Sequence, residues 1–522
     1  MHVSTIQAGD FLRLSAQRFP DRDCFVFGDG TSRSFAETNQ RVNRLADALR
    51  RRGLAKGDRV AILGTDSGEY VEVILACMKL GVVYVPLNNR LADAEVLTLL
   101  RKARPRALFS SGRYLERVAA LAPLLTGITL LCSLDGDRLL PFDALLGEGH
   151  DVEPFVEVQD EDVLALAFTS GTTGLPKGVL QSQRMLNALA LNMSIDYEIM
   201  AEEFRYTASP IFHIAGQAMI FMHIMRGFPT LILPQFDAGP VLRWMQSGRL
   251  TGAFLVPTMI SRLLSDPRVA DGTYEGLRSI IYGAAPMTPA LLRRAMSVFK
   301  CDFINAFGAA TEGGLQASLS AADHRRAAAG AEHLLGSIGK PAFGVDLRLV
   351  NEDGQDVPPG EVGEIVTRST AVMSGYLEMP EEAARAIRDG WFWGGDLARM
   401  DKDGYLYLAG RSKDMIIRAG ENIYPIEIET VLADYPGVTG VAVVGQPDEH
   451  WGEIVVAFLT AEAGAAIERD AIRRFCRERL AAYKVPEVVT VIAEMPLNAS
   501  GKILKRELRA GLAAANPVTA RH

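Results

Sequence analysis

Short apolar runs rich in β-branched residues alternate, along most of this chain, with amphipathic stretches of helical period. The clearest runs are Arg59–Leu63, Val82–Val85, Thr230–Leu233 and Ala253–Val256. Between them, Ala36–Arg52 carries an apolar stripe at helical spacing. Strands that are continuously apolar and alternate with helices are typical of largely parallel, buried sheets. The pattern therefore predicts an α/β fold.

The pattern changes after about residue 400. A turn signal at Asp401–Gly404 precedes the strand-like Tyr405–Leu408. The remainder contains helix-like segments at Ile426–Tyr435 and Arg469–Leu480, and strand-like segments at Thr439–Val444 and Ile454–Leu459. Its length, about 110 residues, suits a small α+β domain. We therefore predict a domain boundary within Gly410–Asp414.

Composition restricts the classes of partner. The 522 residues exceed what one compact core usually holds, and a net charge of −8 disfavours nucleic acid as the main partner. The five scattered cysteines include no CxxC pair, which is typical of reduced cysteines in a cytoplasmic protein. The N-terminus lacks the pattern of a secretory signal. The uncharged stretch Tyr206–Met225 contains proline, histidine and glycine, so we expect a loop that leads into a buried helix rather than a transmembrane segment.

The segment from Thr169 to Gly178 is rich in hydroxyls and glycines and contains Lys177. It follows the apolar run Val163–Phe168. Such a loop can surround phosphate oxygens with backbone N–H groups. It is not a Walker A loop, because Gly178 stands where that motif needs a hydroxyl. On chemistry alone, a phosphate loop and a flexible polar loop are equally good interpretations.

Other short motifs follow this loop in a fixed order. They are Pro210–His213, Gly283–Pro286, Thr311–Glu312, Gly390–Asp396, Gly410–Asp414, Gly420–Asn422 and Asn498–Lys502. The ordered series resembles the motifs of the adenylate-forming superfamily, which includes acyl-CoA synthetases, adenylation domains of peptide synthetases and luciferases. Single motifs often match by chance, whereas an ordered series does not.

The resemblance implies both an architecture and a reaction. The expected fold is a large N-terminal domain of layered α/β sheets at residues 1–409, a hinge at 410–414 and a small, mobile α+β domain at 415–522. A carboxylic acid would attack ATP to give an acyl-adenylate and pyrophosphate, and the acyl group would then pass to the thiol of coenzyme A. The implied cofactors are ATP and Mg²⁺, with coenzyme A as co-substrate.

The resemblance also assigns residues to roles. The catalytic residues would be Lys502, Glu312 and Thr169. The ATP site would comprise Thr169, Ser170, Gly171, Thr172, Thr173, Gly174, Lys177, Gly283, Ala284, Ala285, Thr311, Asp396, Arg411 and Lys502. Glu312 would bind the metal, Lys413 would be the hinge, and Gly420, Glu421 and Asn422 would serve the thioester step. Taken singly, each of these residues would more often have a structural role: Glu312 would cap a helix, Asp396 would form a turn and Lys502 would be solvated.

Three positions depart from the family pattern. The segment Phe307–Glu312 differs from the usual Tyr-Gly-x-Thr-Glu, which leaves the geometry of Phe307–Thr311 open. Gly394 stands where threonine is usual, and Gln183 stands where histidine is common. None of the three removes a charged group that the chemistry needs, so an active enzyme is still expected.

The expected acyl pocket comprises His213, Gly216, Val256, Ala309 and Ala310. These residues are small or uncharged, which favours an apolar acid: a fatty acid first, an aryl or cinnamic acid second. The alternatives are an adenylation enzyme that loads a carrier protein, a luciferase-type oxidase, and an inactive relative that serves as a binding module. We expect small-molecule partners, no nucleic acid, no transmembrane segment, a cytoplasmic location and a homodimer.

Overall fold

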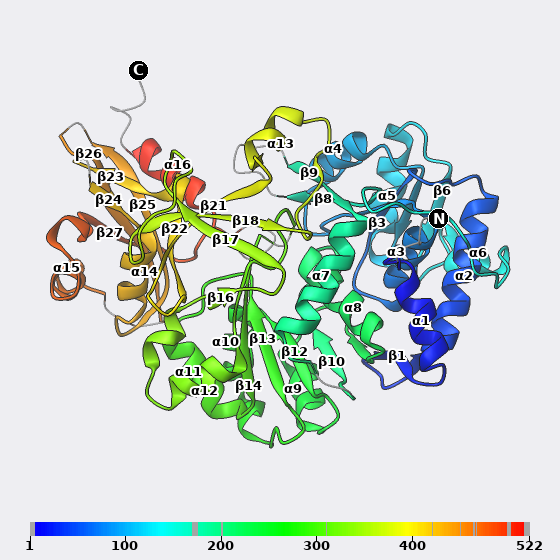
Figure 1. Ribbon diagram of the computed structural model, residues 1–522, viewed down its shortest axis with the longest axis horizontal. Coiled ribbons are helices and arrows are strands. Elements are labelled where there is room, and N and C mark those ends of the chain that lie inside the picture. The colour runs from blue at the N-terminus through cyan, green and yellow to red at the C-terminus, as the bar shows by residue number, and fades with distance from the viewer. Residues whose placement is uncertain are drawn as a thin grey trace.

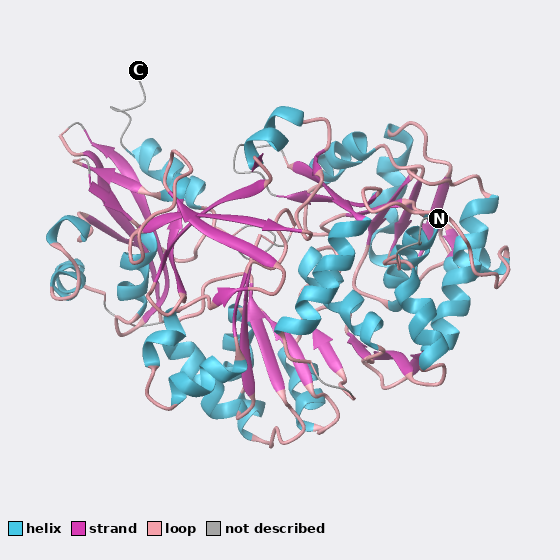
Figure 2. Ribbon diagram, in the orientation of Figure 1, coloured by secondary structure: helices cyan, strands magenta, loops and turns pink. Residues whose placement is uncertain are grey.

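The structure is a computed structural model (Figure 1). It describes residues 6–169, 176–199, 202–309, 311–419, 421–448, 450–462, 465, 467–497 and 503–515. Within these residues the strands form four sheets, and helices lie between and around them (Figure 2).

The first sheet has the strand order β16-β15-β14-β13-β12-β10-β11-β1-β2. Its strands are β1 (Asp23–Phe27), β2 (Ser32–Ser34), β10 (Arg205–Thr207), β11 (Thr230–Ile232), β12 (Gly252–Leu255), β13 (Ser279–Gly283), β14 (Asp302–Phe307), β15 (Ala317–Leu319) and β16 (Lys340–Pro341). The run from β1 to β14 is parallel, so the carboxyl ends of β12, β13 and β14 meet at one edge. In open parallel sheets, ligands bind at this edge.

The second sheet has the order β19-β9-β8-β4-β3-β5-β6-β7. Its strands are β3 (Arg59–Leu63), β4 (Val83–Pro86), β5 (Ala107–Ser110), β6 (Leu130–Ser133), β7 (Leu140–Pro141), β8 (Val163–Thr169), β9 (Lys177–Ser182) and β19 (Gly375–Tyr376). Strands β8 and β9 form an antiparallel hairpin at its edge. The strand β19 comes from much later in the chain and pairs with β9.

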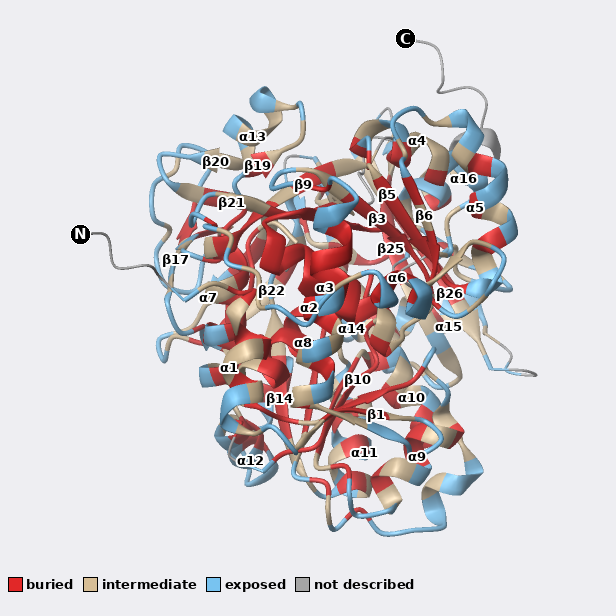
Figure 3. Ribbon diagram, turned by 90° about the vertical axis from the view of Figure 1, so that its right-hand side faces the viewer, coloured by how far each residue is buried: buried red, intermediate tan, exposed pale blue. Residues whose placement is uncertain are grey.

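Helices α3 (Gly68–Leu80) and α8 (Ile214–Arg226) are buried on nearly all sides, as Figure 3 shows. One core cluster joins them to Val60 and Tyr84 of the second sheet and to Phe25 and Ile281 of the first. A helix that is apolar all round needs cover on every face. The two sheets provide that cover, which gives the layered N-terminal region that the sequence predicts.

The third sheet has the order β17-β18-β21-β20, with β22 paired to β21. Its strands are β17 (Val345–Val350), β18 (Val362–Ser369), β20 (Ile387–Arg388), β21 (Trp391–Met400) and β22 (Leu406–Arg411). The fourth sheet has the order β24-β23-β26-β25, with β27 paired to β26. Its strands are β23 (Ile416–Arg418), β24 (Glu421–Ile423), β25 (Val438–Asp448), β26 (Gly452–Ala461) and β27 (Val488–Val491).

The remaining α-helices cover the faces of these sheets. They are α1 (Asp10–Arg18), α2 (Phe35–Arg51), α4 (Asp93–Ala103), α5 (Leu115–Leu121), α6 (Phe142–Gly147), α7 (Gln183–Asp196), α9 (Ala238–Gln246), α10 (Pro257–Ser265), α11 (Pro289–Phe299), α12 (Ala321–Ala328), α13 (Pro380–Ala386), α14 (Pro425–Ala433), α15 (Arg469–Arg477) and α16 (Lys505–Ala515). A capping box starts α2, because the Ser34 hydroxyl accepts from Glu37 N–H and the Glu37 carboxylate accepts from Ser34 N–H.

The predicted α/β class is confirmed, with a large N-terminal region and a smaller C-terminal one. The uncharged stretch Tyr206–Met225 does lead through a loop into a buried helix, α8. Among the described residues, no helix combines the length and apolar character that crossing a bilayer requires. The division at 410–414 stays a prediction; that segment lies between β22, the last strand of the third sheet, and β23, the first strand of the fourth.

Candidate active site

The β8–β9 hairpin presents the predicted phosphate loop. Thr169 ends β8 and lies opposite Lys177, which begins β9, in the antiparallel register. The loop residues Ser170, Gly171, Thr172, Thr173 and Gly174 lie outside the described residues. Because Thr169 and Lys177 are paired, the two ends of the predicted phosphate loop are held together.

Lys177 is half-buried and has two close partners. Its Nζ lies 2.8 Å from Glu382 Oε2 on α13 and 4.9 Å from the centre of the Tyr376 ring on β19. Both partners lie between β18 and β20 of the third sheet, where the chain adds β19 to the second sheet before it returns. The lysine is thus held by an ion pair and a cation–π contact at the end of the phosphate hairpin.

Glu312 lies in a turn just after β14. Its backbone N–H donates to the Ala309 carbonyl at 2.8 Å, and its carbonyl accepts from Met373 N–H at 2.8 Å. Burial, followed by the charges of Glu312 and Glu382, raises the pKa of Tyr376. The charge of the Glu312 carboxylate therefore acts on Tyr376, the residue whose ring Lys177 contacts. A half-buried carboxylate beside a phosphate loop fits Mg²⁺, which prefers carboxylate and phosphate oxygens.

The predicted adenine-side loop leaves the carboxyl end of β13. A Cβ at Gly283 would lie 2.2 Å from the Ala306 carbonyl oxygen of the neighbouring strand, so only glycine fits there. Ala284 follows with a positive φ of 65°, a conformation that costs free energy for a residue with a side chain. Ala284 and Ala285 are both exposed at this edge. The loop is therefore open to a ligand.

Asp396 and Arg411 are brought together as cross-strand partners on β21 and β22. Arg411 Nε donates to Asp396 Oδ1 at 3.0 Å, and the Asp396 side chain is only 15% exposed. Gly395, with φ of 78°, bends the chain before Asp396, and its N–H donates to Glu364 Oε1 at 3.0 Å. A carboxylate fixed in this way can accept hydrogen bonds from vicinal hydroxyls such as those of ribose.

The predicted hinge residue Lys413 is exposed and lies in the short 3₁₀ turn Ser412–Asp414. Asp414 pairs with Arg509 of α16 at 3.0 Å. Glu421 and Asn422 are exposed on β24, which pairs with β23. Gly420 and Lys502 lie outside the described residues, so their predicted roles rest on the sequence motifs.

The predicted acyl-pocket residues come from several elements. His213 precedes α8 and is half-buried, with its ring centre 4.6 Å from that of Phe212. Val256 follows β12, and Ala309 packs beside the cluster of Val179, Met185, Val372, Met373 and Phe392. Ala310 lies outside the described residues.

Gly216 has no free space on the side where a side chain would project. A Cβ there would lie 2.5 Å from the carbonyl oxygens of both Ser209 and Pro210. The absence of a side chain therefore allows α8 to approach the backbone of the preceding loop. The small size of Gly216 thus serves packing on this side, and its place in the acyl pocket stays a prediction.

Four carboxylate or phenol groups near the site were not predicted from the sequence: Asp66, Glu364, Tyr376 and Glu382. Asp66 Oδ1 accepts from Ile211 N–H at 2.9 Å and so ties the loop before His213 to the end of β3. Burial raises the pKa of Asp66 to about 7. Tyr376 and Glu382 reach Lys177 only because β19 pairs with β9. No local sequence signal marks these pairings.

Gln183, where histidine is common in the family, has a structural contact. Its side chain is fully buried at the start of α7, and its Oε1 accepts from Ala8 N–H at 3.1 Å. It therefore ties the N-terminal segment to the helix that follows the phosphate hairpin. The substitution leaves Lys177 and the hairpin register in place.

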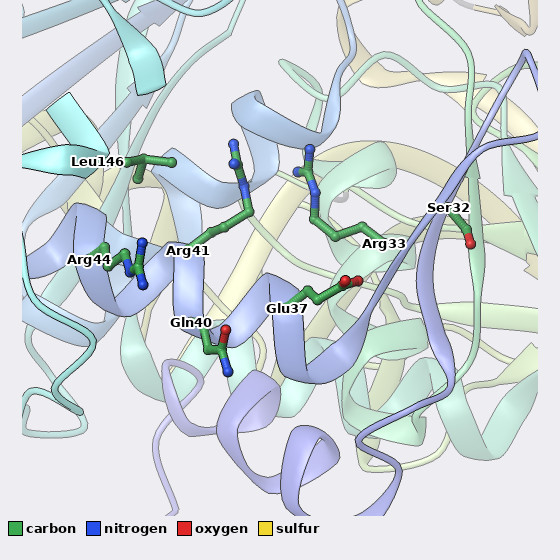
Figure 4. Close-up of a pocket in the computed structure, with 7 residues that line it drawn as sticks. All are labelled: Ser32, Arg33, Glu37, Gln40, Arg41, Arg44 and Leu146. Atoms are coloured by element: carbon green, nitrogen blue, oxygen red, sulfur yellow. The ribbon is translucent and has the colours of Figure 1, made fainter. Parts of the chain in front are cut away.

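A pocket of about 310 Å³ lies away from these residues, along α2 (Figure 4). Its lining residues are Ser32, Arg33, Glu37, Gln40, Arg41, Arg44 and Leu146. Arg33 and Arg41 both bind the buried carboxylate of Glu72. Their charge is thus neutralised within the fold, and no predicted site residue lines this pocket.

Comparison with known proteins agrees with these assignments at the level of the family. Residues 12–377 match the AMP-binding enzyme family, and residues 427–502 match the AMP-binding enzyme C-terminal domain. The chain is 38% identical over 482 residues to a feruloyl-CoA synthase from an Amycolatopsis species, covering 92% of this chain and 94% of that protein. It is 34% identical over 492 residues to the long-chain-fatty-acid–CoA ligase FadD13 of Mycobacterium tuberculosis, covering 93% and 94%.

A solved structure extends the agreement to the whole fold. ATP-bound MatB from Rhodopseudomonas palustris superposes with a TM-score of 0.88 at 29% identity, over 97% of this chain and 99% of that one. The resemblance that the motifs indicated is thereby confirmed. The chain belongs to the AMP-binding enzyme family, as an AMP-forming acyl-CoA ligase that uses ATP, Mg²⁺ and coenzyme A.

Proposed function

We propose that this ligase activates an uncharged, apolar carboxylic acid, with an aromatic acid of the cinnamic type as the first candidate. The observation that carries the proposal is the 38% identity to a feruloyl-CoA synthase along 92% of the chain. The predicted pocket segments support an uncharged acid. Residues 213–217, 256–260, 282–286 and 305–309 contain no lysine, arginine, aspartate or glutamate that could bind a second charge.

A fatty acid is the second candidate. The relation to a long-chain-fatty-acid–CoA ligase and the small, half-buried Ala309 favour it. The packing at Gly216 argues against a long acyl chain, because this glycine adds no depth to the predicted acyl pocket on the side of Ser209 and Pro210. A flat aromatic acid needs less depth than a long alkyl chain. We therefore place the aromatic acid first.

A screen of thioester formation distinguishes the candidates. Ferulate, cinnamate, hexanoate, octanoate, palmitate and a dicarboxylate would be compared with coenzyme A as acceptor, and with a phosphopantetheinylated carrier protein in parallel. We expect the highest kcat/KM for the aromatic monocarboxylates with coenzyme A. A preference for palmitate would support the second candidate. A preference for the dicarboxylate would contradict both, because a site that pairs a second charge rejects acids without it.

The site residues have complementary tasks in the proposed first step. Lys177 would bind the β- and γ-phosphates, and Asp396 with Arg411 would orient the ribose. Lys502 would lie between the acid's carboxylate and the α-phosphate and reduce their repulsion. Glu312 would hold Mg²⁺, which when bound neutralises phosphate charge. In this proposal the protein contributes orientation and fixed charge.

The proposed second step requires the C-terminal domain to turn about Lys413. We predict that Lys413→Pro leaves one half-reaction close to wild type and lowers overall thioester formation by about tenfold or more. Proline fixes φ near −65° and restricts the residue before it, so it limits the rotation. ATP–pyrophosphate exchange reports the first step, and thioester formation from pre-made adenylate reports the second.

Lys413→Ala is the matched control for this hinge. It removes the ammonium but keeps backbone freedom, so both half-reactions should stay within about twofold of wild type. If the folded proline variant also retains both rates, residue 413 is not the hinge. The cytoplasmic location and the homodimer stay predictions.

A further inference from the structure

Glu382 forms an ion pair with Lys177, the lysine that is proposed to bind the phosphates of ATP. Its Oε2 lies 2.8 Å from Lys177 Nζ, and the two side chains are 31% and 23% exposed. The lysine ammonium lowers the pKa of Glu382, so this carboxylate is ionised at neutral pH. A phosphate oxygen that binds the same ammonium has the same charge and hydrogen-bonding chemistry as this carboxylate oxygen.

The fold holds Glu382 in this position from a distant part of the sequence. Leu377 N–H donates to the Gly178 carbonyl at 2.7 Å, and Ser374 N–H donates to the Leu180 carbonyl at 2.9 Å. These bonds attach the segment before α13 to β9, the strand that Lys177 begins. Figure 1 shows α13 above the β8–β9 hairpin. Backbone pairing therefore keeps Glu382 close to Lys177.

Glu382 also has a second cation available. Its Oε1 accepts from Arg385 Nη1 at 2.8 Å, one helical turn along α13. If Lys177 turned to a phosphate, Arg385 would still neutralise the carboxylate. The Tyr376 ring, 4.9 Å from the ammonium, would continue to support the lysine. If Lys177 exchanged Glu382 for a phosphate, both the lysine and the glutamate would still have a partner of opposite charge.

We propose that Glu382 competes with the phosphates of ATP for Lys177 and thereby sets the enzyme's affinity for ATP. The inference rests on the proposed role of Lys177 as a phosphate-binding residue. Because the pair is partly exposed, its effect on affinity is modest. Removing the carboxylate should tighten ATP binding about two- to fivefold.

Calorimetric titration of Mg²⁺–ATP into the full-length protein, without acid, tests the inference. Glu382→Gln keeps the shape of the side chain and removes its charge, and we expect its Kd to fall about two- to fivefold. Glu378→Gln is the matched control: it removes the same charge from the same segment, but Glu378 pairs with the exposed Arg104. Its Kd should equal that of the wild type.

Two further variants separate this inference from the proposed function. Lys177→Ala should weaken binding, and adding Glu382→Gln to it should produce no further change, because the competed cation is gone. If Lys177→Ala leaves Kd unchanged, the phosphate role of Lys177 fails. If Lys177→Ala weakens binding while Glu382→Gln leaves Kd unchanged or raises it, the competition is refuted. A raised Kd would mean that Glu382 positions the lysine instead.

Discussion

Replacing Lys502 with alanine is expected to slow formation of the acyl-adenylate on the order of 10²–10³-fold and to spare the second half-reaction. The reason is electrostatic: the first step alone brings two anions, the carboxylate and the α-phosphate, into contact. Acid-dependent ATP–pyrophosphate exchange measures the first step. Thioester formation from a supplied acyl-adenylate measures the second.

A neighbouring lysine provides the control for Lys502. Lys505, at the start of α16, pairs with Glu429 at 2.7 Å. Lys505→Ala removes the same charge three residues further along and should leave pyrophosphate exchange within about twofold. Equal losses of both half-reactions in Lys502→Ala would show that this lysine maintains structure instead.

Replacing Glu312 with alanine is the second change with a large expected effect. Loss of the carboxylate that is proposed to hold Mg²⁺ should lower the rate of adenylation on the order of 10²–10³-fold at ordinary Mg²⁺ concentrations. Raising the Mg²⁺ concentration should restore part of the activity, since the metal can still bind through phosphate oxygens. Pyrophosphate exchange as a function of Mg²⁺ concentration measures both effects.

An exposed glutamate is the control for Glu312. Glu332, whose side chain is 69% exposed, pairs with Arg293 of α11. Glu332→Gln should leave exchange unchanged at every Mg²⁺ concentration. Exchange close to wild type in Glu312→Ala would refute the metal assignment. A loss that extra Mg²⁺ leaves unchanged would indicate that Glu312 has a structural role next to the Phe307–Thr311 segment.

Much of the fold could be predicted because local pattern and tertiary burial agree. The run Arg59–Leu63 is β3 itself, and the stripe of Ala36–Arg52 is α2, shifted by one residue. The helix carries its apolar residues on one face at helical period, and the strand is a short β-branched run that is buried on both faces, so each pattern agrees with the burial of its element. The predicted strand Tyr405–Leu408 starts one residue early and ends three residues early, because β22 continues to Arg411 to pair with β21.

Site residues could be predicted where each of them belongs to a sequence motif. Residues outside the motifs could not be predicted where only the pairing of distant strands brings them to the site. Asp396 and Arg411 were expected from separate motifs, and the β21–β22 register joins them. Glu382 could not be expected, since its contact with Lys177 depends on the β19–β9 pairing. At Gly216 the sequence could not show the close approach to Ser209 and Pro210, because a small residue can either leave space or allow two backbones to meet, and only packing distinguishes the two.

The most direct test of the two-step reaction is isotopic. The enzyme would convert ATP, coenzyme A and its best acid, labelled with ¹⁸O in both carboxylate oxygens, and the products would be examined by ³¹P NMR and mass spectrometry. Attack of the carboxylate on the α-phosphate predicts one ¹⁸O in each AMP and none in pyrophosphate. Label in inorganic phosphate together with ADP, or AMP without label, would contradict an acyl-adenylate intermediate.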